Sequence, residues 1–320
     1  MLEFLYLAAF QIFLQMVGKK KKISRKEFIQ RTSRAIIATG IITASPAKHL
    51  ISQKSLEKCN LGNTGITMTK LGFGASRTQE SSLLKYAIAQ GITFIDTGRG
   101  YANGKNEEMV GSVVKGKRSD VVIQSKVRLG LEGKITGTNS ESTRLGEMFW
   151  KSLHESLTAL QTDYIDVLLF HGAEVDDILF HDAVLESFMK AKEEGKIRAA
   201  GFSTHTNQTG LVKKAVEIPA YDVIMTAFNH SGGYIHSNSA RKDSWDQEQL
   251  ILQLKAAAGK GIGIVAMKTC SGGPYDPDNN TEPSLPGAVK WVLHQDYIHT
   301  AAVAMANFAQ VDDHIRLLVS

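Results

Sequence analysis

Eight short apolar runs, separated by stretches with helical spacing, constrain this chain more than any other feature of its sequence. Each run is almost continuously apolar, which is typical of parallel strands covered on both faces. The alternation of runs and stretches predicts parallel strands joined by helices. The eight predicted strands cover residues 69–75, 92–96, 121–126, 164–171, 197–203, 222–228, 261–268 and 300–305.

The segments between the runs carry apolar residues three and four positions apart, which places these residues on one face of a helix. Phe149, Leu153 and Leu157 follow this spacing. Residues 182–194 repeat it, and Gly195 follows as a helix stop. The same pattern recurs at residues 84–88 and 246–259.

Eight strands, each followed by a helix, within roughly 250 residues match a closed (β/α)8 barrel, the TIM barrel. An open doubly wound sheet is the alternative on the pattern alone. Residues 59–68 precede the first predicted strand. We expect them to form an N-terminal hairpin that closes the bottom of the barrel.

One glycine motif suggests a different nucleotide-binding fold. Gly72 and Gly74, followed by Asp96 about twenty residues later, resemble part of a dinucleotide fingerprint. Arg77 stands where the third glycine belongs. Because a lone G-x-G is also typical of a tight turn, we do not predict a Rossmann domain.

The charges are divided unevenly along the 320 residues. Residues 1–55 hold ten of the 37 Lys and Arg residues but only two of the 32 acids, so the rest, with 27 bases and 30 acids, is slightly acidic. The rest therefore has no basic surplus for nucleic acid. We predict a leader over 1–55, disordered or cleaved, and a barrel over 56–320.

The leader has the layout of an export signal. A lysine run, an uncharged stretch and small residues follow one another within residues 16–50. The segment SRKEFI resembles a twin-arginine signal peptide, with Lys26 in place of the second arginine. We expect the export machinery to carry the protein to the periplasm, with a cytoplasmic location as the alternative. Met16 is the expected start, since the signal is complete without residues 1–15.

Other classes of protein are disfavoured by what the sequence lacks. Two cysteines, Cys59 and Cys270, are too few for a disulfide framework or a four-thiolate zinc site. No apolar run reaches the ~18 residues of a membrane-spanning helix, so we predict no stable membrane span.

Titratable residues close three of the predicted strands. Asp96, Lys126 and His171 are the last residues of their runs, and Tyr101 follows Asp96 by five positions. In a barrel, the ends of the strands meet at one rim, where the chemistry is located. We therefore expect the four side chains to gather at the barrel mouth.

Together these four residue types can protonate a carbonyl group. A free tyrosine has a pKa near ~10, and a neighbouring Lys126 ammonium is expected to lower it. Asp96 can hold that ammonium in place, and His171 can orient the carbonyl oxygen. No side chain donates a hydride, so NADP or NAD is implied as cofactor and a small carbonyl compound as substrate.

At these residues the chain resembles the aldo-keto reductases. The resemblance covers about residues 60–315 and implies the barrel fold, a catalytic tetrad of Asp96, Tyr101, Lys126 and His171, and NAD(P)H lying across the barrel mouth. The segments that carry it are GITFIDTGRGYANGKNEEMVG (91–111), VVIQSKV (121–127), LHESLTALQTDYIDVLLFHG (153–172) and GKIRAAGFST (195–204).

The resemblance also implies contacts to the nicotinamide. Ser203 and Thr204 stand where the family has serine and asparagine, and Ser203 is expected to bind the carboxamide. Met225 falls near the position of a family glutamine. Met267 takes the place of the aromatic residue that stacks on the nicotinamide.

The phosphate contacts follow from the same resemblance. Lys268 and the glycine-rich loop at Gly272 are expected to face the pyrophosphate. Gln310 occupies a place where the family often has a cation for the 2′-phosphate, so the choice between NADPH and NADH stays open.

Two other functions stand as alternatives. One is a nicotinamide-binding regulatory or partner protein on the same barrel, against which the complete tetrad argues. The other is a metal-dependent hydrolase. His154 and Glu155 begin an H-E-x-x-H pattern, but residue 158 is threonine, so no metal site is predicted.

Overall fold

The computed structural model describes residues 55–129, 138–173, 176–235 and 242–319, and eight parallel strands in it form a closed barrel. The strands follow the order β11-β12-β3-β4-β5-β6-β7-β8, and β8 pairs with β11 to close the ring. Their bounds are β3 (Leu71–Gly74), β4 (Phe94–Asp96), β5 (Val122–Val127), β6 (Ile165–Phe170), β7 (Ile197–Thr204), β8 (Val223–Ala227), β11 (Gly263–Met267) and β12 (Thr300–Ala304).

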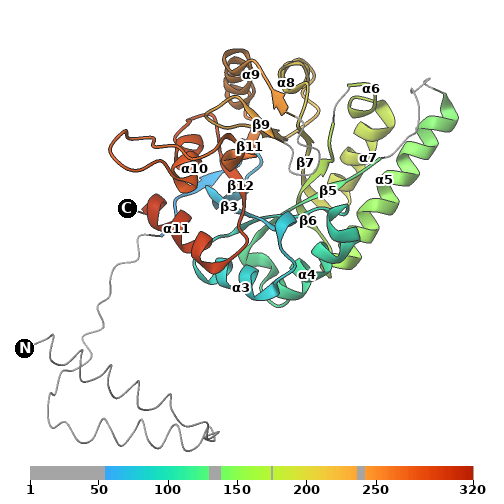
Figure 1. Ribbon diagram of the computed structural model, residues 1–320. Coiled ribbons are helices and arrows are strands. Elements are labelled where there is room, and N and C mark those ends of the chain that lie inside the picture. The colour runs from blue at the N-terminus through green and yellow to red at the C-terminus, as the bar shows by residue number, and fades with distance from the viewer. Residues whose placement is uncertain (1–54, 130–137, 174–175, 236–241, 320) are drawn as a thin grey trace, which may run out of the picture. The chain divides into compact units, whose positions relative to one another are not determined.

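Helices surround the barrel on its outside, as Figure 1 shows. Each barrel strand leads into an α-helix, and the segment after β6 holds two α-helices, a short one followed by a longer one. The helices are α3 (Ser81–Ala89), α4 (Lys105–Val114), α5 (Asn139–Leu160), α6 (Asp176–Leu179), α7 (Asp182–Glu193), α8 (Gln208–Glu217), α9 (Gln247–Gly259), α10 (Leu285–Leu293) and α11 (Phe308–Val319).

The predicted (β/α)8 barrel is confirmed, and the open doubly wound sheet is wrong because the pairing of β8 with β11 leaves no sheet edge. Each of the eight predicted runs overlaps one barrel strand, and β5 and β7 extend one residue beyond their runs. The predicted strand at 69–75 begins too early, since Thr69 belongs to the preceding hairpin strand. Helix α7 ends before Gly195, whose φ of 68° suits glycine at a helix stop.

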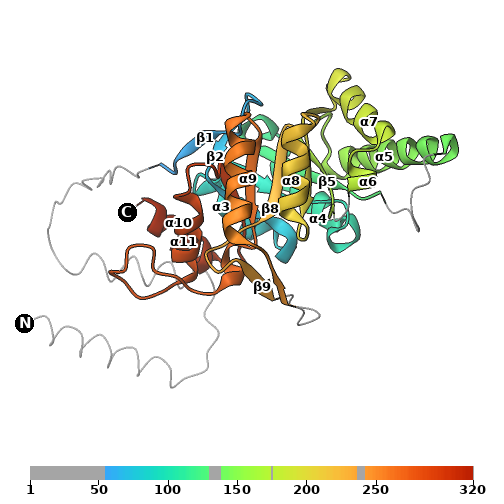
Figure 2. The same cartoon turned by 90° about the horizontal axis from the view of Figure 1, so that it is seen from above.

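The predicted hairpin closes the lower end of the barrel. Strand β1 (Lys58–Asn60) pairs antiparallel with β2 (Thr67–Thr69). Leu61, Ile66 and Met68 are buried in the same apolar cluster as the inward side chains of the barrel. In Figure 2 this hairpin and β9 (Gly233–Ile235) lie at opposite ends of the barrel.

Large and small side chains alternate inside the barrel. Gly72 is the register neighbour of Phe94, and a Cβ on Gly72 would overlap the Phe94 ring. Gly201 is likewise the neighbour of Leu169, whose side chain occupies the space that a Cβ would need. The glycines thus let bulky groups fill the lower and middle barrel, and polar groups gather above them.

The predicted leader falls almost wholly outside the described residues, which begin at Ser55. Among the residues that are described, no helix combines the length and the apolar character needed to cross a bilayer.

Candidate active site

The structure brings the four predicted tetrad residues together. Asp96 ends β4, Lys126 lies in β5, and His171 directly follows β6. Tyr101 begins the short 3-10 helix η2 (Tyr101–Gly104). The Lys126 Nζ lies 4.8 Å from the centroid of the Tyr101 ring, and the Tyr101 and His171 rings meet edge to face at 5.6 Å.

Lys126 is fixed by strong hydrogen bonds in the barrel interior. Its side chain is only 1% exposed. Its Nζ donates to Oδ1 of Asp96 at 2.5 Å and to the backbone carbonyl of Thr97 at 2.7 Å. An ammonium has three N–H donors, and the third is left to interact with the Tyr101 side chain.

The electrostatics of Tyr101 correct one prediction. We expected Lys126 to bring the pKa of Tyr101 below its ordinary value. Burial instead raises the pKa of Tyr101 by more than the Lys126 charge lowers it, so the pKa lies above that of a free tyrosine. Tyr101 therefore carries its proton at neutral pH, which a proton donor must do.

Lys126 is positively charged, whereas His171 is neutral. Burial is the largest single effect and disfavours the Lys126 ammonium, but the charges and hydrogen bonds of Asp96 and Tyr101 together outweigh it, and the pKa of Lys126 is raised. Burial and the positive charge of Lys126 lower the pKa of His171 to about 3. His171 is therefore a neutral imidazole. Its Nδ1 is buried and has no hydrogen-bond partner among the described residues.

The loop that carries Tyr101 has an unusual backbone. Ala102 and Asn103 both adopt left-handed conformations, with φ of 49° and 52°, which non-glycine residues rarely do. Gly104 follows with φ of 87°, and a Cβ there would overlap the Arg99 guanidinium. Arg99 in turn pairs with the buried Glu107 at 3.0 Å. The Arg99 side chain, which is paired with Glu107, thus holds this turn in place.

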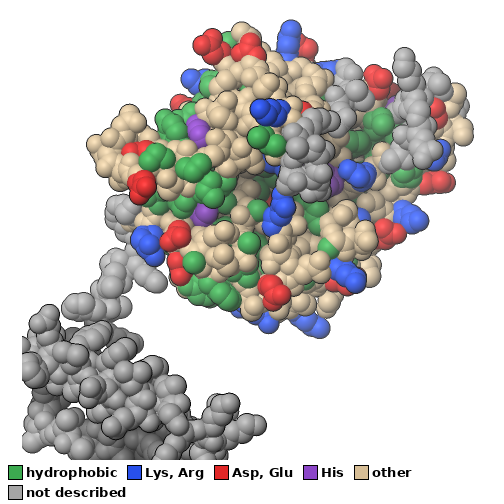
Figure 3. All heavy atoms as spheres, viewed as in Figure 1, with side chains coloured by type: hydrophobic (Ala, Val, Ile, Leu, Met, Phe, Trp, Pro, Cys, Tyr) green, Lys and Arg blue, Asp and Glu red, His purple; other side chains and the backbone are tan. Residues whose placement is uncertain are grey.

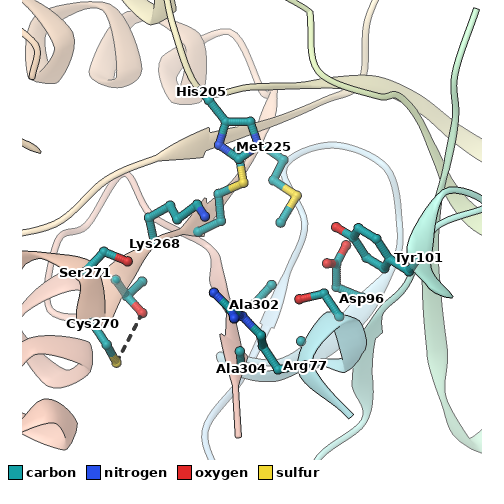
Figure 4. Close-up of a pocket in the computed structure, with 14 residues that line it drawn as sticks. Arg77, Asp96, Tyr101, His205, Met225, Lys268, Cys270, Ser271, Ala302 and Ala304 are labelled. Carbon is teal, nitrogen blue, oxygen red and sulfur yellow. Dashed lines mark hydrogen bonds between the residues drawn. The ribbon is translucent and has the colours of Figure 1, made fainter. Parts of the chain in front are cut away.

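A cavity of about 190 Å³ opens beside the tetrad at the carboxyl ends of the strands. Figure 3 looks onto this end and shows a hollow near the barrel axis with basic side chains around it. Figure 4 shows Asp96 and Tyr101 on one side of the cavity and Lys268 on the other. The lining residues are Gly74, Ser76, Arg77, Asp96, Tyr101, His205, Met225, Met267, Lys268, Thr269, Cys270, Ser271, Ala302 and Ala304.

Of the predicted cofactor residues, Met267 and Lys268 line this cavity, as does Met225 at the position of the family glutamine, and the other four do not. The Ser203 hydroxyl is buried and accepts a hydrogen bond from the Gly172 N–H at 3.1 Å. The hydroxyl of Thr204, also buried, donates to the carbonyl of Thr206.

The last two of these four residues, Gly272 and Gln310, have local structural contacts. Gly272 ends the 3-10 helix η4 (Thr269–Gly272), and a Cβ there would crowd Ser231 and Asn229. Gln310 accepts a hydrogen bond from the Ala306 N–H at 2.7 Å, which braces the start of α11.

Sequence reasoning missed several residues of the site. The Gln124 amide donates to Oδ1 of Asp96 at 2.7 Å. Gln124 stands two positions before Lys126, and the alternation of a strand could have placed both on the inner face. Arg77, at the end of the short 3-10 helix η1 (Ala75–Arg77), and His205, in the bend after β7, line the cavity from segments too short to show a periodicity. Among the described residues, no group of three or more His, Cys, Asp and Glu side chains is placed to hold a metal ion.

Known proteins resemble this chain in sequence and fold. It is 30% identical to the uncharacterized oxidoreductase YqkF of Bacillus subtilis over 154 residues, which are 47% of this chain and 49% of that protein. It is also 30% identical to the aldo-keto reductase YhdN of the same bacterium over 161 residues, 46% of this chain and 47% of that one. The chain thus spans about half the length of the curated relatives it matches.

Solved structures share the fold. An aldo/keto reductase from Klebsiella pneumoniae, in complex with NADP and acetate, superposes with a TM-score of 0.59 at 21% identity, covering 83% of this chain and 90% of that one. The sequence model of the aldo/keto reductase family matches residues 65–301, well over half of the chain. This chain therefore belongs to the aldo/keto reductase family.

Proposed function

We propose that this chain is an NAD(P)-dependent oxidoreductase that reduces the carbonyl group of an aldehyde or ketone. The observation that carries the proposal is the buried Asp96–Lys126 pair, with Nζ and Oδ1 2.5 Å apart, directly beside a protonated Tyr101 at the edge of a cavity. Acid–base groups of this kind contribute to catalysis when they can reach the reacting oxygen. Family membership supports the same reaction class.

Each tetrad residue has one task in the proposed reaction. Tyr101 gives its hydroxyl proton to the carbonyl oxygen, and the Lys126 ammonium stabilises the phenolate that remains. Asp96 keeps Lys126 charged and in place. The neutral His171 can donate one hydrogen bond that orients the carbonyl. The bound nicotinamide supplies the hydride, a chemistry that no side chain offers.

The residues around the cavity fit such a cofactor. Lys268 and Arg77 both line it, and burial together with the Arg77 charge lowers the pKa of Lys268. Two cations held this close to each other favour an anionic ligand such as a pyrophosphate. Met225 and Met267 provide an apolar wall for a flat ring.

Removing the Lys268 charge tests the cofactor assignment. We expect Lys268→Met to weaken NADPH binding by about ten- to a hundredfold, since one charge-assisted hydrogen bond contributes about 1.5–3 kcal/mol. The matched control is Lys260→Met, which removes the same charge from an exposed position at the other end of the barrel. Quenching of tryptophan fluorescence by NADPH and NADH measures the affinity of both variants for each nucleotide.

Turnover is measured on the same samples as carbonyl-dependent oxidation of NADPH or NADH. The proposed function fails if the wild-type protein neither quenches with a nicotinamide nor turns over any carbonyl in a broad panel. Binding without any turnover would instead favour the regulatory or partner protein. Equal affinities of the two lysine variants would remove Lys268 from the cofactor site and leave the reaction class intact.

We also propose that the leader directs export, on the strength of its basic, apolar and small-residue order and the SRKEFI segment. A twin-arginine route moves folded proteins with their cofactor, which would bring a nicotinamide along. Fractionation of native cells should find the protein outside the cytoplasm, and replacing Arg25 and Lys26 by glutamine should retain it inside. A wild-type protein that stays in the cytoplasm with residues 16–44 intact contradicts export.

A further inference from the structure

Gln124 occupies the centre of the barrel directly below the tetrad. It lies in β5 opposite Asp96 in the strand register, and its side chain is 0% exposed. Its Nε2 donates to Oδ1 of Asp96 at 2.7 Å, and the same oxygen accepts the Lys126 ammonium at 2.5 Å. One carboxylate oxygen therefore receives a neutral and a charged donor together.

The remaining contacts of Gln124 are poor ones. The same Nε2 lies 3.3 Å from the Met225 sulfur, which is a weak acceptor. Its Oε1 is buried and has no hydrogen-bond partner among the described residues. A buried acceptor without a partner is destabilising, and an apolar side chain of the same shape would avoid that cost. Packing alone therefore does not account for a glutamine here.

We propose that Gln124 is a positioning residue of the reaction, whose amide holds the Asp96 carboxylate in the orientation that keeps Lys126 against Tyr101. The proposal rests on the proposed function. An amide suits the task because it donates without adding a charge. A second cation at this place would compete with Lys126 for Asp96, and an apolar residue would leave the carboxylate free to rotate about its side-chain torsion.

The first test replaces the amide with an apolar group of similar length. We expect Gln124→Met to lower kcat about tenfold, while the KM for the carbonyl and the affinity for NADPH stay within about twofold, because Gln124 does not line the cavity. The control is Gln208→Met. Gln208 is a buried glutamine, 4% exposed, on the outer helix α8. A Gln124→Met protein that keeps its full kcat overturns the proposal.

The second test measures how the contact between side chain 124 and Asp96 depends on pH. The charged groups facing side chain 124 are Asp96 on β4 and Lys126 on its own strand, whereas Val167 on β6 and Met225 on β8 are uncharged. In Gln124→Glu, a protonated carboxyl can still donate to Asp96, and an ionised one repels it. We expect kcat relative to wild type to fall as the pH rises between about 5 and 8. A constant ratio contradicts the proposal.

The third test needs no turnover. The introduced carboxyl of Gln124→Glu should have a raised pKa in the folded state beside Asp96, so stability is present at low pH and lost as the pH rises through that value. We expect this loss of the free energy of unfolding, measured with urea at about pH 5 and 8, to be smaller in an Asp96→Asn background. Equal losses would show that the two side chains do not interact.

The two kinds of failure are distinguishable. If the wild-type protein turns over no carbonyl, the proposed function fails, and the unfolding measurements still report whether Gln124 and Asp96 interact. If the wild type is active and Gln124→Met matches it, the positioning role fails while the reaction class stands.

Discussion

Tyr101→Phe is expected to lower the rate of carbonyl reduction about a thousandfold, within the range that a positioned general acid contributes. The substitution removes one hydroxyl and keeps the ring that packs against His171 and Lys126. Because the pKa of Tyr101 is raised, the hydroxyl is protonated throughout the neutral range, and its removal takes away the proton source itself. Single-turnover measurements with saturating NADPH isolate this step.

The matched control for Tyr101→Phe is Tyr86→Phe. Tyr86 also uses its hydroxyl in a hydrogen bond, to Asp312 at 2.6 Å, but it lies on the outer helix α3. We expect this variant to reduce carbonyls at the wild-type rate, and both variants to bind NADPH normally. A Tyr101→Phe protein with an undiminished reduction rate would exclude Tyr101 as the acid.

Lys126→Met is expected to reduce both activity and stability strongly. It leaves the Asp96 carboxylate, only 3% exposed, without its charged partner. Breaking a buried pair in this way lowers the free energy of unfolding by about 3–5 kcal/mol. Activity should fall about a thousandfold, because the phenolate formed from Tyr101 would lose its neighbouring cation. Urea unfolding and steady-state kinetics measure the two effects.

A double variant that combines Asp96→Asn with Lys126→Met separates the effect on stability from the effect on activity. With both charges removed, no unpaired ion remains inside the barrel, so we expect most of the stability to return. Activity should not return. The pKa of Lys126 is raised, so the pair contributes its full stability below the ordinary lysine pKa and loses it only as the pH rises beyond that value. A double variant as unstable as Lys126→Met would mean that the pair is not what stabilises this region.

The strand ends could be predicted because three of the four tetrad residues interrupt an apolar run. Asp96, Lys126 and His171 terminate runs whose inward positions, Gln124 excepted, are otherwise apolar, and a closed barrel brings such ends to one rim. The apolar pattern was also sufficient to predict the hairpin, whose Leu61 and Met68 face the barrel interior.

The balance of charge and burial could not be predicted in the same way. The sequence places Lys126 near Tyr101, but the raised pKa of Tyr101 depends on how completely the surrounding atoms exclude water. The proximity of Arg77 and Lys268 depends on two short segments, each with a 3-10 helix, that follow different strands, β3 and β11. The left-handed backbone at Ala102 has no sequence signal, whereas Asn103, followed by Gly104, forms a dipeptide typical of such turns.

The glycine–aromatic neighbours inside the barrel restrict how this chain can evolve. Gly72 and Phe94 jointly fill one volume, so a side chain gained at 72 has no room unless the ring at 94 is lost in the same lineage. Either change alone gives an overfilled or hollow intermediate of lower stability. Natural variation at these two positions is therefore expected to be correlated. A large side chain at one position should go with a small one at the other, on the adjacent strand.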